Sequence, residues 1–542
     1  MASKPQQPTN HLATSAIPSR DDASAGQASS AASANSTRPA SLAGRIASAF
    51  RSAPLETRFL SILLILFLAK GVIFTFVFPP FSGHDEVAHY AYLQILVEEQ
   101  RIPLIPDPVA FEANYSQANP PHFDAFPSYM EEYSRFTTPD WYKVTDGVVS
   151  AVTYLGNHLP SGWIYTANHP PLYYLLMAPV YWMTENASPE TQLYALRLAA
   201  IPLGMLTVLF AFLTVRRLFP RDRFLAVTVP TLVAFQPQIA YEAAMLNNDI
   251  LAIATTSACI YLIVVGLRNR FTVGLCAWLG LALGLAMVSK STAVMVMPVI
   301  AVAMIAGLGW KNVREWLPKG GLVLGITAVI AAPWYGYMLA TYGNFTAFDR
   351  IQTLQWWNYS GGARPGILEQ LSNPNFAWMR WRETWGEFGW RLIPVGESML
   401  EALFLLSVIA VTGFLVWGVL TTVVRLRVRS ASQSRIRELA ANTDPILTLS
   451  RWQIIGVASM ALTCGVSYYA VLQFGTSFAL TQARYYFPAV NAAAIVIALG
   501  VRMITPMRWQ PLMQTAVFVG MFLLNVVILS SYVIPYWNDG LT

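Results

Sequence analysis

Charged side chains are scarce in this sequence. Asp, Glu, Lys and Arg together make up 12% of its 542 residues, about half of the roughly 25% that is usual in soluble domains. The hydrophobic fraction is 55% and the mean hydropathy is +0.45. These values exclude an ordinary soluble protein and predict a chain that crosses a membrane many times.

Cysteine is almost absent as well. Cys259, Cys276 and Cys464 all lie in apolar runs, where cysteine behaves as a small hydrophobic residue. The sequence therefore predicts neither a disulfide framework nor a cysteine-based metal site. The net charge of +6 is typical of cytoplasmic Lys and Arg in a membrane protein, so we expect no nucleic-acid partner.

Long apolar runs dominate what is present. A helix needs about 20 apolar residues to cross roughly 30 Å of hydrocarbon, and about eleven runs qualify. The predicted fold class is an all-α polytopic membrane protein. The runs lie at 59–79, 195–215, 224–241, 250–267, 272–289, 292–309, 321–340, 398–424, 453–474, 486–503 and 512–533.

The connections between the runs differ in charge. Residues 1–55 are rich in Ala, Ser and Pro, which predicts a disordered cytoplasmic tail before a membrane domain at 56–542. Arg and Lys gather in every second connection, and the positive-inside rule places those in the cytoplasm. The others face outward, and the long ones are 80–194 and 341–397. Within the first, 84–99 and 170–184 are predicted to be juxtamembrane helices.

The outward ends hold an unusual share of ionisable and polar residues. Such residues are costly next to a bilayer, so they indicate a functional site. Carboxylates and bases at one membrane depth predict a site for an anionic lipid headgroup. The candidates are Asp85, Glu86 and His89 after the first run, His169 in HPPLYYLL, Asn247, Asn248 and Asp249 in MLNNDILA, Lys290 in AMVSKSTAV, and Arg484 with Tyr485 in QARYYFP.

In their order and shared sidedness, these motifs resemble the GT-C superfamily of integral membrane glycosyltransferases. Within it, the arrangement is similar to the protein O-mannosyltransferase and lipid A aminoarabinose transferase group. The resemblance runs from about residue 59 to residue 536, and HDEVAHY, HPPLYYLL, NND, GLAMVSKST and QARYYFP carry it. It implies a GT-C-like bundle with extracytoplasmic juxtamembrane helices and a plasma-membrane location.

The resemblance also implies a reaction. A sugar would pass from a polyprenyl-phosphate donor to a hydroxyl acceptor outside the cytoplasm, the acceptor being a glycolipid, a polysaccharide or a protein. The family's catalytic carboxylate maps to Asp85, with Glu86 beside it, and a positioned Asp can act as general base. Lys290 and Arg484 would stabilise the leaving phosphate.

Direct displacement would invert the anomeric centre, although paired carboxylates also suit a retaining route. The expected substrate-binding set is His89, His169, Asn248, Asp249, Lys290, Arg484 and Tyr485. His169 stands where some members have lysine, so it either contacts phosphate or starts a helix. No cofactor is required, and whether a divalent cation bridges Asp85 and the donor stays open. The sequence shows no Gly-rich nucleotide-binding loop, so a nucleotide-sugar donor is not expected.

The candidate residues also have alternative, purely structural interpretations. Asp85 and Glu86 suit the first turn of a helix, and Asn248 with Asp249 suits a helix cap. Lys290 could snorkel to the interface without a ligand, and Arg484 with Tyr485 could be an interfacial anchor. A transporter or flippase is the rival function, but it would place charges at mid-depth rather than at one face.

Overall fold

The structure is a computed structural model that describes residues 50, 52–105, 164–354, 365–389, 391–430, 443–476 and 481–539. The chain divides into two units, Met1–Ala53 and Pro54–Thr542, and the second contains the helical fold. The predicted tail at 1–55 lies almost entirely outside the described residues, as do large parts of the outward connections, 106–163 and 355–364.

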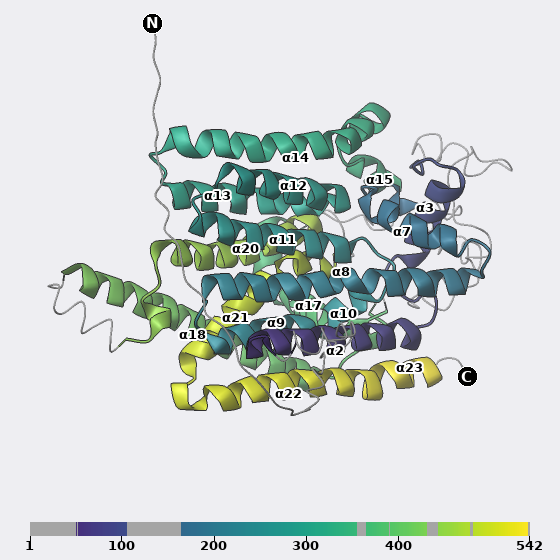
Figure 1. The fold of residues 1–542 in the computed structure, drawn as a ribbon. Coiled ribbons are helices and arrows are strands. Elements are labelled where there is room, and N and C mark those ends of the chain that lie inside the picture. The colour runs from purple at the N-terminus through teal and green to yellow at the C-terminus, as the bar shows by residue number, and fades with distance from the viewer. Residues whose placement is uncertain are drawn as a thin grey trace, which may run out of the picture. The chain divides into compact units, whose positions relative to one another are not determined.

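Helices account for about four fifths of the described residues (Figure 1). Short 3₁₀ turns and one π-turn, η8, join or extend them: η2 (Tyr165–Asn168), η3 (Ser291–Met295), η5 (Pro445–Leu447), η6 (Ala483–Ala489), η7 (Met507–Trp509) and η8 (Leu529–Val533). The α-helices are α2 (Leu55–Val77), α3 (Glu86–Glu98), α7 (Leu172–Met183), α8 (Pro189–Leu218), α9 (Arg223–Ala234), α10 (Pro237–Ala243), α11 (Asp249–Arg268), α12 (Val273–Ser289), α13 (Val296–Leu308), α14 (Val313–Tyr342), α15 (Phe348–Leu354), α16 (Ile367–Ser372), α17 (Pro374–Trp385), α18 (Glu397–Ser430), α20 (Arg451–Gly475), α21 (Val490–Ile504), α22 (Gln510–Ile528) and α23 (Ile534–Asp539).

Among the described residues, nine helices are long and apolar enough to cross a membrane, and the bent pair α9 and α10 makes ten. Helix α12 is apolar but shorter, with 17 residues. Together these helices match the eleven runs read from the sequence, so the all-α polytopic fold class is confirmed. The described strands form a single two-stranded antiparallel ladder, β1 (Glu387–Phe388) with β2 (Ile393–Pro394).

Helices α9 and α10 are separated by a break inside the membrane domain, where the two axes differ by 55°. Pro237 cannot donate a backbone hydrogen bond, and Gln236 caps the new helix. A break in a membrane frees carbonyl groups that need donors. Lys70 of α2 donates to the Ala234 carbonyl at 2.7 Å, and Asn525 of α22 donates to the Phe235 carbonyl at 2.7 Å. Two buried polar side chains therefore support the break.

Helices α3 and α7 pack against each other at one end of the long helices, where α15 also lies (Figure 1). The rings of Tyr92 and Tyr174 stack with centroids 3.6 Å apart, and Tyr181 donates to Glu98 at 2.7 Å. Both segments predicted to form juxtamembrane helices are thus helical, and their ends lie near the polar residues predicted from the sequence.

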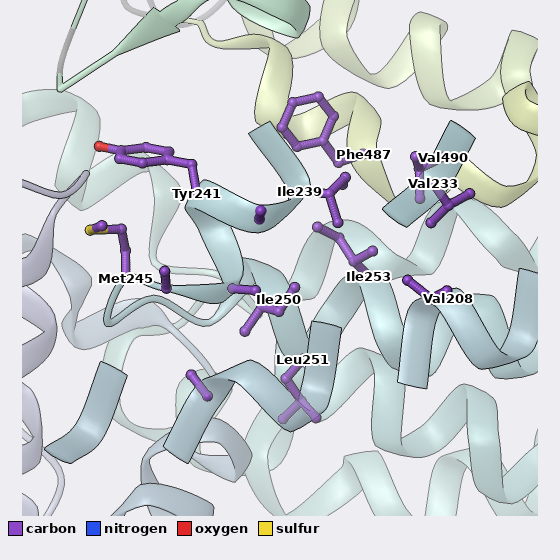
Figure 2. Close-up of a cluster of buried hydrophobic side chains, with 14 of the residues drawn as sticks. Val208, Val233, Ile239, Tyr241, Met245, Ile250, Leu251, Ile253, Phe487 and Val490 are labelled. Atoms are coloured by element: carbon purple, nitrogen blue, oxygen red, sulfur yellow. The ribbon is translucent and has the colours of Figure 1, made fainter. Parts of the chain in front are cut away.

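Buried apolar side chains pack together where α10, α11 and η6 meet. Figure 2 shows Ile239 of α10, Ile253 of α11 and Phe487 of η6 (Ala483–Ala489) pointing towards one another. Both isoleucines are fully buried, and Phe487 is 3% exposed. Burying such side chains contributes about 1.5–3 kcal/mol each, so this packing fixes α10, α11 and η6 relative to one another.

A buried acid and base cluster as candidate active site

Two acids and two bases meet where several membrane helices end. We call Asp85, Asp249, Lys290 and Arg484 the acid–base cluster. Arg484 Nη2 donates to Asp85 Oδ2, and Arg484 Nη1 lies 3.5 Å from Asp249 Oδ2. Lys290 Nζ donates to Asp249 Oδ1 at 2.6 Å. None of these four side chains is more than 10% exposed, so the charges compensate one another away from bulk water.

The direction of each helix explains why these residues meet. Asp85 precedes α3, Asp249 begins α11, Lys290 follows the last residue of α12, and Arg484 lies in the first turn of η6. Since α11 begins where α12 ends, the two helices run antiparallel, and α21 continues η6 away from the site. The structure therefore brings together residues up to 399 positions apart in sequence, as the predicted topology required.

Asp85 has an unusual backbone conformation. Its φ is 59° and its ψ is 12°, in the left-handed region, which Asp adopts more readily than most non-glycine residues. Its Oδ1 accepts a hydrogen bond from the Tyr165 hydroxyl at 2.9 Å, while Oδ2 faces Arg484. A non-glycine residue in this region persists only when its surroundings hold it there.

Glu86, the next residue, supplies that support and points away from the cluster. It is fully buried, and its carboxylate accepts from Arg197 Nε at 2.8 Å and from Arg197 Nη2 at 2.5 Å. It also accepts from the backbone N–H groups of Gly83 and Leu246, both at 2.8 Å. With its acceptors occupied in this way, Glu86 is a structural residue in this geometry, and of the two predicted catalytic carboxylates only Asp85 faces the cluster.

Arg197 ties the loop after α2 to helix α8. Its Nη1 donates to the carbonyls of Thr75 and Phe78 at 3.0 and 2.8 Å, and its Nη2 donates to the Pro79 carbonyl at 2.9 Å. Together with Glu86 it fixes the path of residues 75–86. The arginine, which is fully buried, therefore positions Asp85 without touching it.

His89 and His169 lie beside each other, with ring centroids 5.5 Å apart. His89 Nδ1 is 2.8 Å from the Tyr174 hydroxyl. Burial lowers the pKa of His89 to about 3 and lowers the pKa of His169 well below its ordinary value. Both imidazoles are therefore neutral at pH 7. The N-cap residue of α7 is Pro171, not His169, so capping that helix does not account for the histidine.

The remaining predicted residues also lie near the cluster. Asn248 is the N-cap residue of α11 but its side chain makes no capping hydrogen bond; instead Asn247 Oδ1 accepts from the N–H groups of Asp249 and Ile250 at 3.0 and 3.3 Å. Asn248 Nδ2 donates to the Ser289 carbonyl at 3.1 Å, which links α11 to the end of α12. The Tyr485 ring lies 5.1 Å from Lys290 Nζ, within the range of a cation–π contact.

Nearby positive charges keep the Asp85 carboxylate ionised. Burial is the largest single influence and disfavours its ionised form, but the adjacent Arg484 guanidinium, with smaller contributions from His89 and His84, more than offsets burial, so the pKa of Asp85 lies well below its usual range. Arg484 can donate further hydrogen bonds, because its Nε and Nη1 have no hydrogen-bond acceptor within the part of the chain that the structure describes. Guanidinium N–H groups donate charge-assisted hydrogen bonds to phosphate oxygens. The cluster can thus hold an anionic group against an ionised carboxylate.

Metal ligands are a separate question. In the described ranges, no group of three or more His, Cys, Asp or Glu side chains is arranged to hold a metal ion. The question of a divalent cation between Asp85 and a donor phosphate, which the sequence leaves open, is not tested by this arrangement.

Several residues of the site were not found from the sequence. Arg197 sits inside an apolar run, and an ionisable residue at such a position is itself a signal. Tyr165 and Glu242 carried no comparable signal, because a tyrosine in a loop and a glutamate near a helix end are common. They belong to the site only through the packing of α3, α10 and η2 (Tyr165–Asn168).

The comparisons with known proteins bear on residues 168–336, which match the family described as dolichyl-phosphate-mannose-protein mannosyltransferase. No curated protein matches the chain. Asp249 and Lys290 lie inside the matched segment, whereas Asp85 and Arg484 lie outside it.

Two solved structures are similar over most of this chain. ArnT from Cupriavidus metallidurans, bound to undecaprenyl phosphate, is 13% identical over 86% of this chain and 65% of its own, with a TM-score of 0.37. The archaeal oligosaccharyltransferase AglB from Archaeoglobus fulgidus, in complex with an inhibitory peptide and a dolichol-phosphate, is 11% identical over 88% of this chain and 56% of its own, with a TM-score of 0.45. This chain therefore spans less than two thirds of either protein. The similarity to the dolichyl-phosphate-mannose-protein mannosyltransferase family is thus confined to residues 168–336, about a third of the chain.

Proposed function

We propose that the protein transfers a sugar from a polyprenyl-phosphate donor to a hydroxyl acceptor at the extracytoplasmic face of the membrane. The observation that carries the proposal is the acid–base cluster, in which an ionised Asp85 contacts an arginine that still has N–H groups to offer. The family match over residues 168–336 supports the same class of donor.

The donor phosphate binds to Arg484 and Lys290 in this proposal. Its prenyl chain extends into the bilayer between the helices, and the sugar stays at the membrane surface. Phosphate oxygens occupy the Arg484 Nε and Nη1 groups and compete with Asp85 and Asp249 for the two cations. Charge-assisted hydrogen bonds of this kind are about twice as strong as neutral ones, so they hold the reactive phosphate at a fixed place.

Asp85 then takes the acceptor proton. The hydroxyl oxygen attacks the anomeric carbon while its proton passes to Asp85, and the bond from that carbon to the phosphate oxygen breaks with its electron pair. Polyprenyl phosphate leaves with an added negative charge, which Lys290 and Arg484 stabilise. Because one displacement occurs, the anomeric centre inverts.

The contact between Asp85 and Arg484 gives the donor a further role. While Arg484 holds the pKa of Asp85 well below its usual range, the carboxylate is a weak base. A donor phosphate that draws Arg484 towards itself weakens this contact and raises the proton affinity of Asp85. General-base catalysis improves as the pKa of the base approaches the working pH, so donor binding prepares Asp85 for the acceptor.

A transporter has less support from the charge distribution. Lys70 is a buried charge inside a spanning helix, and its described partners are the Ala234 carbonyl and Asn525. It thus supports a break in the backbone between α9 and α10. The acid–base cluster lies at helix ends, which suits chemistry on a headgroup better than a path through the bundle.

The test uses radiolabelled polyprenyl-phosphate sugars added to membranes that contain the wild type, Asp85→Asn or Asp349→Asn. Asp349 is an exposed aspartate on α15 and serves as the matched control. We expect Asp85→Asn to lower label transfer by roughly 10³-fold, as loss of a general base does, and the control to keep it. Equal transfer by Asp85→Asn would remove Asp85 from catalysis, and no transfer by the wild type from any lipid donor would favour transport.

A further inference from the structure

Tyr165 contacts the Asp85 carboxylate from η2, which lies outside the helices long enough to cross the membrane. Its hydroxyl donates to Asp85 Oδ1 at 2.9 Å, while Arg484 donates to Asp85 Oδ2. The two oxygens of one carboxylate therefore have different partners. One partner is a neutral phenol, and the other is a cation that the proposed donor phosphate also binds.

The Asp85 carboxylate is not used to cap its own helix. Asp85 stands at the N-cap position of α3, where an aspartate usually accepts from the backbone N–H groups of the first turn, yet its side chain makes no such bond. Both oxygens instead contact residues of other elements, Tyr165 of η2 and Arg484 of η6. Helix capping thus does not explain how this side chain is placed.

The position of Tyr165 is fixed by contacts that lie outside the acid–base cluster. The next residue, Thr166, donates through Oγ1 to the Ala88 carbonyl of α3 at 3.0 Å. At the end of η2, Asn168 Nδ2 donates to the Thr346 carbonyl, between α14 and α15, at 3.3 Å. These bonds hold η2 against α3 and against the segment after α14, so a ligand that changes the contacts of the cluster leaves the Tyr165 hydroxyl in place.

The charged and titratable groups around Asp85 come from every neighbouring element. They are His84 before α3, His89 on α3, Tyr165 on η2, His169 after η2, Tyr174 on α7, Asp249 on α11, Lys290 after α12, and Arg484 and Tyr485 on η6. Of these, Tyr165 and Arg484 donate hydrogen bonds to the carboxylate.

We propose that Tyr165 is the positioning residue of the general base: its hydroxyl holds Asp85 Oδ1, so that Oδ2 takes the acceptor proton once the donor phosphate draws Arg484 towards itself. This inference rests on the proposed function and adds which atom of Asp85 acts as the base. The acceptor oxygen bonds to the anomeric carbon as its proton moves to Oδ2, and the bond from that carbon to the phosphate oxygen breaks with its electron pair. Tyr165 keeps its own proton throughout.

Loss of the Tyr165 hydroxyl has two consequences for Asp85. The carboxylate becomes able to turn about its terminal torsion, which has broad preferences, and a displaced catalytic group costs up to about 10²-fold in rate. A hydrogen bond to the ionised form of an acid also favours that form, so its removal raises the pKa of Asp85. Since transfer needs the ionised carboxylate, the acidic limb of the pH–rate profile then moves to higher pH.

The experiment measures label transfer across acidic and neutral pH in membranes that contain the protein. The donor is radiolabelled polyprenyl phosphate that carries mannose, glucose, galactose or arabinose. Tyr165→Phe keeps the ring and removes the hydroxyl, whereas a ring-fluorinated tyrosine at position 165 keeps the hydroxyl and makes it a stronger donor. The matched control is Tyr469→Phe, at an exposed tyrosine of α20. Thermal unfolding verifies that each variant is folded, and the fluorinated protein tests the inference even where Tyr165→Phe lowers stability.

We expect Tyr165→Phe to lower the rate at saturating donor about tenfold, because lost orientation outweighs the gain in basicity. Its acidic limb should move up by about one pH unit, and the fluorinated variant should move the limb to lower pH. The donor concentration that gives half of the maximal rate should stay unchanged in both, because Lys290 and Arg484 hold the phosphate. Tyr469→Phe should behave like the wild type.

Two results would overturn the inference and leave the proposed function standing. One is an acidic limb that stays in place in both variants at position 165, because a merely structural tyrosine slows transfer without changing the proton affinity of Asp85. The other is a saturated rate that does not fall in Tyr165→Phe, which would show that Asp85 needs no such positioning. Wild-type protein that transfers label from no lipid donor would instead contradict the proposed function, and the inference with it.

Discussion

Replacing Glu86 by Gln should destabilise this protein far more than replacing its neighbour Asp85 by Asn. The two carboxylates are adjacent in sequence, but Glu86 is fully buried against Arg197, while Asp85 faces Arg484 in a site that also contains Asp249. The prediction separates a structural carboxylate from a catalytic one.

The magnitude follows from the contacts of Glu86. A Gln oxygen can keep the bonds from Arg197 Nε and the Leu246 N–H, both at 2.8 Å. Its NH₂ group would then face Arg197 Nη2 and the Gly83 N–H, where the carboxylate accepts at 2.5 and 2.8 Å. Two hydrogen bonds are lost and a buried guanidinium loses its counter-charge. Breaking a buried pair in this way costs about 3–5 kcal/mol, so we expect a loss of about 4 kcal/mol in the free energy of unfolding.

For Asp85→Asn the loss should be about 1 kcal/mol, close to an average substitution. Arg484 keeps Asp249 as a counter-charge at 3.5 Å, and Asp85 is slightly exposed to solvent, at 10%. Arg197→Met should destabilise at least as much as Glu86→Gln, because it also removes three hydrogen bonds to backbone carbonyls.

The assay is reversible unfolding in mixed micelles, with increasing denaturing detergent and tryptophan fluorescence as the readout. The exposed Glu401→Gln serves as a control for loss of one carboxylate. Transfer activity is measured on the same samples. If Glu86→Gln unfolded like the wild type and yet lost transfer, Glu86 would be a chemical group and the structural reading would be refuted.

Three further changes test other parts of the structure. Because Asp85 has a pKa below its usual range when folded, its contribution to stability is complete above about pH 4 and is lost as the pH falls below that. The difference in unfolding free energy between the wild type and Asp85→Asn should therefore be constant from neutral pH down to about pH 5 and shrink below about pH 4, and a difference that grew on acidification would contradict this. Lys70→Met should lower the unfolding free energy by about 2 kcal/mol, since a helix carbonyl inside the membrane loses its donor; no change would mean that the break between α9 and α10 needs no such support. For Gly83→Ala, the new Cβ would lie 2.6 Å from Glu86 Cδ, so we expect lower stability and lower transfer together, and a variant with normal values of both would show that the loop can shift without disturbing Asp85.

The sequence was a good guide to the membrane topology and to the residues at one face. Each apolar run became a helix or a bent pair, because a helix satisfies its own backbone in a bilayer and needs only length and apolar composition. The alternation of Arg and Lys between connections also placed Asp85, Asp249, Lys290 and Arg484 at the same helix ends. Their meeting needed no knowledge of side-chain packing.

The sequence predicted the roles of individual residues less well. It paired Asp85 with Glu86 as one catalytic unit, and the two side chains diverge because Asp85 adopts a left-handed backbone conformation. It left Asn248 and Asp249 open between a helix cap and substrate binding, and in the structure Asn248 stands at the N-cap position of α11 while the capping hydrogen bonds come from the Asn247 side chain. Such assignments depend on backbone angles that no spacing rule predicts.

The amino-acid sequence by itself determined a polytopic helical membrane protein and the set of scarce ionisable residues at one of its faces, since hydrocarbon thickness and the cost of charge act on each segment separately. Only the tertiary structure decided that Arg197 takes Glu86 as its partner, that Lys70 supports a broken helix, and that Arg484 lies between Asp85 and Asp249. These outcomes depend on which helix ends meet and at what depth. That is fixed by packing among segments distant in the chain, which local sequence cannot specify.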